Sequence, residues 1–233
     1  MSGSAHNTPS SDAVALAERA AAAFRDGRAE EARAGFAEAL DRGPTDLRVL
    51  FLAFQFHFRA GEYDAAEAMV RRRIDVIGPD VESADAGRAW CNLGLVFHHR
   101  GQFDDAEAMM ARAIGIDRRI GCEYGVARDV GNLGLVFESR NDHDRAVELY
   151  HESLEIAERI GADDIAAGKW ANMGDIAHAR GRMDEARRLW TRAVELFAKV
   201  GDEKHRTEFV GKITALDSRG DQAGASGAPN LAR

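Results

Sequence analysis

Residues 89–121 read AWCNLGLVFHHRGQFDDAEAMMARAIGIDRRIG, and this stretch decides the fold. In its first half, apolar or small residues recur at i, i+3, i+4 and i+7, one face of a helix: Trp90, Leu93, Gly94 and Phe97. Gly101 then interrupts the pattern. The second half shows helical spacing again, from Ala106 to Ile114, and ends at Gly121. The stretch therefore predicts two helices joined by a tight turn, with a glycine closing the second helix.

The same pattern returns with a step of 40 residues. Asn-Leu-Gly at 92–94 is followed by Asn-Leu-Gly at 132–134 and by Asn-Met-Gly at 172–174. Nearer the N-terminus the step is 34 residues, from Gly27 to Gly61. A period in this range is typical of stacked helix pairs, because one pair cannot bury its apolar face alone.

The composition fits such an array. The chain has 233 residues, of which 45% are hydrophobic, and only four are prolines, which favours helix. Its formal net charge is −8 without a block of Lys or Arg, which argues against a nucleic-acid or membrane partner. Cys91 and Cys122 are too few for a disulfide framework, and no apolar segment is long enough for a signal core or a membrane span. We therefore expect free thiols and a cytoplasmic location.

The sequence offers little chemistry. His98 and His99 are adjacent, so on a helix they project about 100° apart and chelate poorly together, even with Cys91 or His178 nearby. The glycines punctuate repeats and do not form phosphate-binding loops. We expect no metal, no cofactor and no catalysis, which leaves an enzyme as the least favoured interpretation.

These residues resemble the tetratricopeptide repeat (TPR) family. The third repeat matches the family pattern at Trp90, Leu93, Gly94, Phe97, Gly101, Phe103, Ala106 and Ala113. The 40-residue variant with Asn-Leu-Gly is similar to the longer repeats of kinesin light chains, LGN-type scaffolds and many bacterial TPR proteins. The resemblance implies an all-α, right-handed TPR superhelix, an α-solenoid of five repeats. The departures are Phe54 in place of a small residue, Ala177 in place of an aromatic and Asn141 in place of a glycine.

The expected organisation follows from the repeat. Residues 1–11 and 218–233 are predicted to be disordered tails. The TPR domain spans 12–217, with repeats at about 12–45, 46–82, 83–122, 123–162 and 163–202 and a capping helix at 203–217.

The first helix of each pair is expected to line a concave groove. Asn92, Asn132 and Asn172 would form a ladder that pairs with a peptide backbone, because an amide both donates and accepts; kinesin light chains and LGN use asparagines in this way. The alternative is that these asparagines bond within the helix pair. The other predicted groove residues are Leu95, Leu135, Arg48, Arg88, Arg128, Phe51, Phe58, His99 and Asp175.

Two groups remain open to another interpretation. Phe51 and Phe58 belong either to the groove or to the core, whereas Phe54 and Phe56 are predicted to be core. Arg100, Arg140 and Arg180 recur just before a turn, where they are expected to complement the helix dipole rather than contact a ligand.

The predicted function is a non-catalytic module that binds a peptide or protein segment in the groove, with arginines favouring an acidic segment. One alternative is a homo-oligomeric scaffold, and another is a peptide-sensing regulatory TPR protein. The sequence does not identify the partner.

Overall fold

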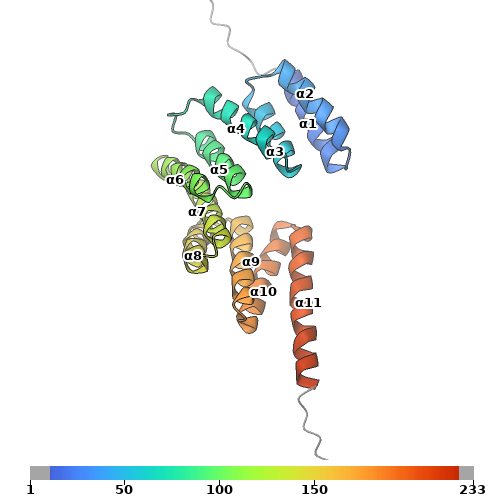
Figure 1. Ribbon diagram of the computed structural model, residues 1–233, viewed down its shortest axis with the longest axis vertical. Helices are drawn as coiled ribbons and strands as arrows, with labels where there is room; N and C mark the ends of the chain where they lie inside the picture. The colour runs from blue at the N-terminus through green and yellow to red at the C-terminus, as the bar shows by residue number, and fades with distance from the viewer. Residues whose placement is uncertain (1–10, 226–233) are drawn as a thin grey trace, which may run out of the picture. The chain divides into compact units, whose positions relative to one another are not determined.

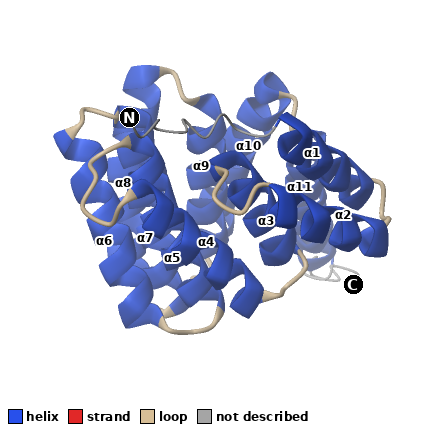
Figure 2. Ribbon diagram, turned by 90° about the horizontal axis from the view of Figure 1, so that it is seen from above, coloured by secondary structure: helices blue, strands red, loops and turns tan. Residues whose placement is uncertain are grey.

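The computed structural model describes the backbone of residues 11–225 and the side chains of residues 11–218. Within this part every regular element is an α-helix, and eleven helices follow one another (Figures 1 and 2). The all-α prediction is confirmed. The predicted tails lie largely outside the described residues, but Ser11 already begins α1 and the last helix continues to Ala225. No proline occurs between 218 and 225 to break that helix.

The chain divides into two compact units, the first ending at Cys122. In the described part of this unit, each helix packs antiparallel to its neighbour in three pairs. The pairs are α1 (Ser11–Arg25) with α2 (Ala29–Arg42), α3 (Leu47–Arg59) with α4 (Tyr63–Ile77), and α5 (Ala84–His99) with α6 (Phe103–Arg119).

The second unit begins at Glu123 and repeats the arrangement. Its helix pairs are α7 (Glu123–Ser139) with α8 (His143–Ile160) and α9 (Asp163–Ala179) with α10 (Met183–Val200), and α11 (Glu203–Ala225) packs against α10. Its core gathers alanines around large side chains of the second helices, among them Tyr150 and Trp190.

The turn inside each helix pair requires a left-handed backbone. Gly101 has φ 73° and Gly181 has φ 74°, a region that glycine enters without steric cost. In the α7–α8 pair the same place belongs to Asn141, with φ 61°. Asparagine is among the few residues with a side chain that tolerate this conformation, so the departure from the family pattern leaves the turn unchanged.

The helices of a pair approach closely where a first-helix glycine faces a large side chain of the second helix. A Cβ at Gly94 would lie 2.8 Å from Cγ of Met110, and one at Gly134 would lie 2.4 Å from Cε1 of Tyr150. At Gly174 the distance to Cδ1 of Trp190 would be 2.3 Å. Each distance is shorter than a van der Waals contact, so a side chain at any of these three positions would force the facing residue to shift.

The α3–α4 pair reverses this distribution of volume. Phe54 stands 40 residues before Gly94, and Val70 stands 40 residues before Met110. Both side chains are buried. The large residue has therefore moved to the first helix and a smaller one to the second, which keeps the filled volume between the helices similar. The prediction that Phe54 and Phe56 belong to the core is confirmed by their burial.

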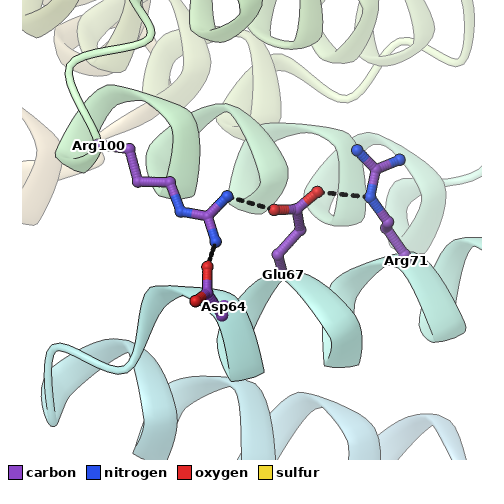
Figure 3. A network of polar contacts seen from close by, with 4 residues as sticks. All are labelled: Asp64, Glu67, Arg71 and Arg100. Atoms are coloured by element: carbon purple, nitrogen blue, oxygen red, sulfur yellow. Dashed lines mark hydrogen bonds and ion pairs between the residues drawn. The ribbon is translucent and has the colours of Figure 1, made fainter.

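Ion pairs join one helix pair to the next. Arg100, the C-cap residue of α5, reaches back to α4, where it contacts Asp64 and donates to Oε2 of Glu67 at 2.5 Å (Figure 3). Arg71 donates to the other oxygen of Glu67. Arg180, the C-cap residue of α9, likewise donates to Oδ1 of Asp144 on α8 at 2.6 Å. Beyond their favourable place at a helix C-terminus, these arginines link neighbouring repeats.

A second such link lies at the start of α4. Oε1 of Glu62 accepts from Nη2 of Arg33 on α2 at 2.5 Å, and its Oε2 lies 2.6 Å from Nδ1 of His57 on α3. The hydrogen bond from Arg33, followed by that from His57, lowers the pKa of Glu62 to about 2. One carboxylate therefore joins three helices of the first unit.

We predict that Gly134→Ala and Gly211→Ala have opposite effects. At Gly134 the new methyl group meets the buried ring of Tyr150, so the free energy of unfolding should fall by about 1–3 kcal/mol. At Gly211 on α11 no atom beyond the adjacent backbone of its own helix lies within 4 Å of the new methyl group, so alanine should add up to about 1 kcal/mol. Urea denaturation measures both. Equal effects would contradict the close approach of α7 and α8.

We predict that Glu62→Gln weakens the acid dependence of stability. The folded pKa lies below the unfolded value of 4.5, so the stabilisation is present above that pH and is lost as the pH falls towards 2. The variant should therefore lose less stability than the wild type across this window in urea melts. Glu155→Gln, at an exposed position on α8, is the control and should keep the wild-type slope. An unchanged slope in Glu62→Gln would exclude the Arg33 and His57 contacts as its source.

Candidate functional site

In each unit the first helices of successive pairs contact one another through side chains. In the first unit, the rings of Phe58 on α3 and His99 on α5 have centroids 4.9 Å apart. In the second unit, the hydroxyl of Tyr124 on α7 donates to Asp164 on α9 at 2.7 Å. All twelve predicted groove residues lie on these first helices. We call the surface that the first helices form in each unit its first-helix face: α1, α3 and α5 in the first unit, and α7 and α9 in the second.

Aromatic rings line the first-helix face of the first unit. The centroid of Phe54 lies 6.5 Å from that of Phe51 and 5.5 Å from that of Phe58. Phe54 is buried, whereas Phe51 and Phe58 are half-buried. Each of these two rings therefore packs on the buried Phe54 and also contributes to the surface. Phe51 and Phe58 thus belong partly to the core and partly to the first-helix face.

The predicted cations of this face have contacts inside the protein. Nη2 of Arg48 lies 3.4 Å from Oε1 of Glu18 on α1, and both side chains are about half exposed. The guanidinium of Arg88 lies 6.0 Å from the centroid of Phe51, within the range of a cation–π contact. Asn92 follows Arg88 by one helical turn on α5 and is half-buried, as is Leu95.

His99 lies against the aromatic group of this face. Its ring stacks on Tyr63 with centroids 5.4 Å apart, in addition to its edge contact with Phe58. Burial lowers the pKa of His99, so the imidazole is neutral at pH 7. Its role there is that of an aromatic surface rather than a cation.

The first-helix face of the second unit contains a recess between α7 and α9. Its volume is about 240 Å³, and it is lined by Tyr124, Arg128, Asn132, Asp164, Ile165, Gly168 and Lys169. The structure thus brings two predicted residues, Arg128 and Asn132, into one recess. Nε of Arg128 donates to the buried carboxylate of Asp129 at 2.6 Å, which holds the guanidinium in place.

Two predicted residues on α9 are engaged in packing. Asp175 accepts both from Nζ of Lys212 on α11, at 2.8 and 2.9 Å, and from Nε1 of Trp190 on α10, at 3.0 Å. Asn172 is half-buried, and its amide interacts with the hydroxyl of Tyr150 on α8. Asp175 therefore links α9 to α11, and Asn172 contributes to the interface between α9 and α8.

Near these residues a buried hydroxyl supports a carboxylate. The hydroxyl of Tyr150 donates to Oε2 of Glu138 on α7 at 2.5 Å. Burial raises the pKa of Glu138, an effect that the Tyr150 hydrogen bond opposes. Burial also raises the pKa of Tyr150, so the phenol stays protonated and remains a donor. Leu135 lies on the same helix, half-buried against the core of this unit.

Sequence reasoning missed two cations near the first-helix faces. Arg73 comes from α4, a second helix, and only 6% of it is exposed. Lys169 on α9 is also buried, with Nζ 5.3 Å from the ring centroid of Tyr150. The sequence contained a signal for both cations, because each aligns with a small residue of another repeat. Arg73 aligns with Ala113, and Lys169 aligns with Ala89 two repeats earlier.

Sequence comparison assigns these helix pairs to a family. Tetratricopeptide repeat profiles match residues 23–76, 85–159 and 170–192. The chain is a tetratricopeptide-repeat protein. The TPR resemblance inferred from the repeats is thereby confirmed, and no curated protein sequence matches the chain.

Solved structures share this TPR fold. A thermophilic TPR protein from Thermus thermophilus has a TM-score of 0.63 at 15% identity, with 85% of this chain and 97% of that chain covered. Kinesin light chain TPR-like repeats from Podosopora anserina reach 0.62 at 14% identity, covering 81% and 96%. Aspartyl phosphate phosphatase F from Bacillus subtilis reaches 0.77 at 14% identity, with 91% of this chain covered, but this chain spans only 57% of it. At these identities the likeness concerns the fold.

No cluster of three or more His, Cys, Asp or Glu side chains among the described residues of this TPR protein is placed to hold a metal ion. None of the helices in residues 11–225 combines the length and the apolar character needed to cross a membrane.

We predict that Tyr150→Phe destabilises the TPR protein by about 1–3 kcal/mol, because it leaves the half-buried Glu138 without its donor. The loss should shrink as the pH falls and Glu138 becomes protonated. Tyr124→Phe removes an exposed hydrogen bond to Asp164 and should cost less than about 1 kcal/mol. Urea melts at neutral and acidic pH compare the two. Equal losses at every pH would show that Glu138 does not depend on this hydroxyl.

Proposed function

We propose that the chain is a non-catalytic protein-interaction module whose first-helix faces bind an extended peptide segment of a partner protein. TPR domains as a family mediate protein–protein contacts, and the finer assignment to these faces is our own. A reducing compartment such as the cytoplasm suits Cys91 and Cys122, neither of which is in a disulfide.

The recess between α7 and α9 is the observation that carries the proposal. Its volume of about 240 Å³ suits one or two peptide residues rather than a drug-sized ligand. Asn132 forms part of its wall, which also contains cationic, acidic and apolar side chains. A recess of mixed chemistry on the face of an interaction repeat supports the binding of one anchoring side chain, with the peptide continuing along the face.

The asparagines supply the capacity to hold a backbone. A carboxamide has two N–H donors and an oxygen with two lone pairs, so Asn132 keeps capacity for a ligand beyond its contacts within the protein. Asparagine is also a poor residue for a helix interior, and its repeated use at 92 and 132 has a cost that ligand binding would explain. Leu95 and Leu135 would add apolar contact, and Arg48, Arg88 and Arg128 would favour acidic side chains.

We predict that Asn132→Ala weakens peptide binding and leaves the fold intact. A random peptide library displayed on phage is selected against the full chain, and the affinity of a selected synthetic peptide is then measured by fluorescence anisotropy. Loss of one or two backbone hydrogen bonds should weaken binding roughly three- to tenfold. The free energy of unfolding should change by less than about 1 kcal/mol, because alanine favours the helix.

His151→Ala, at an exposed position on α8, is the matched control and should bind the peptide like the wild type. If Asn132→Ala and Asn92→Ala both bind selected peptides with wild-type affinity, the first-helix faces are not the binding surface. If the library yields no binder and the chain self-associates at micromolar concentration, a homo-oligomeric scaffold replaces the proposal.

A further inference from the structure

One arginine of the first unit occupies a position that the other repeats reserve for small residues. Arg73 on α4 stands 40 residues before Ala113 and 34 residues after Ala39, and the next two steps lead to Ser153 and Ala193. All four of these residues have 0% exposure, and Arg73 itself is only 6% exposed. A charge has therefore been placed where the repeat normally closes the helix pair with a methyl group or a hydroxyl.

The guanidinium of Arg73 is only partly satisfied. Its Nη2 donates to Oδ1 of Asp85 on α5 at 2.7 Å, whereas Nε and Nη1 are buried without a hydrogen-bond partner. Its flat face lies over the ring of Phe51, with Cζ 5.1 Å from the centroid. Buried donors left unpaired cost free energy, so the arrangement is unfavourable for folding alone.

A second arginine lies against the same ring from the surface. The guanidinium carbon of Arg88 on α5 is 6.0 Å from the centroid of Phe51, and its charge acts against that of Arg73. Burial, with this repulsion, lowers the pKa of Arg73, and Asp85 is the acid that opposes both. Two cations thus lie against one ring while a single carboxylate, Asp85, is paired with Arg73, which leaves the three charged groups with a net positive charge.

The single carboxylate is held loosely. The side chain of Asp85 is 58% exposed and lies in the first turn of α5, whose N-terminus is capped separately by Ser83, which accepts from the backbone N–H of Ala86 at 3.2 Å. Asp85 can therefore turn to water without breaking the cap. Asp85 pairs with one edge of the Arg73 guanidinium, and a ligand carboxylate that arrives from solvent would approach the same edge.

We propose that Arg73, Arg88 and Phe51 form a binding site for a carboxylate side chain of a bound peptide, and that Asp85 occupies this site in the free protein. The peptide carboxylate would displace Asp85, bridge the two guanidinium groups and use the unpaired donors of Arg73. The site lies one helical turn from Asn92 and rests on the proposed binding of peptides at the first-helix face. It makes the partner an acidic segment.

Two synthetic peptides test the site in the full chain. They are fluorescein-Gly-Leu-Glu-Glu-Leu-Gly-amide and its counterpart with two glutamines, and anisotropy gives both affinities at constant ionic strength. The wild type should prefer the glutamate peptide by about tenfold. Arg73→Met keeps the side-chain volume and should abolish the preference, and Arg88→Gln, at an exposed position, should reduce it several-fold. Arg72→Met, next to Arg73 on α4, is the matched control and should keep it.

Asp85→Asn gives the most discriminating result. Because Asp85 competes with the ligand, its removal should strengthen binding of the glutamate peptide several-fold and leave the glutamine peptide unchanged. Weaker glutamate binding in Asp85→Asn, an undiminished preference in Arg73→Met, or no binding of the glutamate peptide by the wild type at millimolar concentration would overturn the site. A peptide with phosphoserine that alone binds would assign the site to phosphate and overturn the carboxylate.

The outcomes separate this site from the proposed function. Asn92→Ala should weaken both peptides equally, because it removes a contact with the backbone. Equal binding of the two peptides by the wild type, lost in Asn92→Ala, would support peptide binding at this face and overturn the carboxylate site.

Discussion

The close approach of the two helices in a pair is the constraint on which the remaining structure depends. At Gly94, Gly134 and Gly174 the first helix has no side chain, and a large residue of the second helix fills the space. The pair then buries Met110, Tyr150 or Trp190 completely or nearly so. A buried tyrosine or tryptophan carries a polar group, which requires a partner. In this chain the partner is a carboxylate of the first helix of the same pair, Glu138 for Tyr150 and Asp175 for Trp190. The packing of the pair therefore determines which polar side chains of the first helices are already hydrogen-bonded within the protein.

The second pair obeys the same constraint by a different distribution of volume. With Phe54 on the first helix, the second helix carries only Val70 at the facing position. The exchange extends further along the pair, since Phe51 and Arg73 also replace residues that are small elsewhere in the array. These three large side chains contact one another in sequence, Phe54 with Phe51 and Phe51 with Arg73. The irregular repeat is therefore a packed alternative, and its packing brings a charged group of a second helix next to the first-helix face.

The repeat and the all-α TPR fold could be predicted from the sequence because they depend on spacing, and spacing is visible in the chain. The turn at Asn141 and the core position of Phe56 followed from the same alignment. The engagement of Asp175 could not be predicted, because Lys212 lies 37 residues away in a helix outside the repeat. Nor could the interaction of Asn172 with Tyr150, since a contact between α9 and α8 depends on how two pairs stack. Arg73 was visible as an exception in the alignment, but its meaning required the contacts with Phe51 and Asp85.

In the regular pairs a small residue of one helix faces a large residue of the other. Exceptions to this size rule also indicate where hydrogen-bonding groups are left for a ligand. A residue that obeys the rule is completed by its partner within the repeat, as Gly134 is by Tyr150 and Tyr150 by Glu138. Such a residue has little interaction energy left for a ligand. Arg73 breaks the rule and remains incompletely paired, held by one exposed carboxylate and opposed by Arg88. An unsatisfied buried donor lowers the stability of the free protein, and a ligand that satisfies it recovers this free energy on binding. If an acidic segment binds there as we propose, the repeat that departs most from the pattern gains most from it.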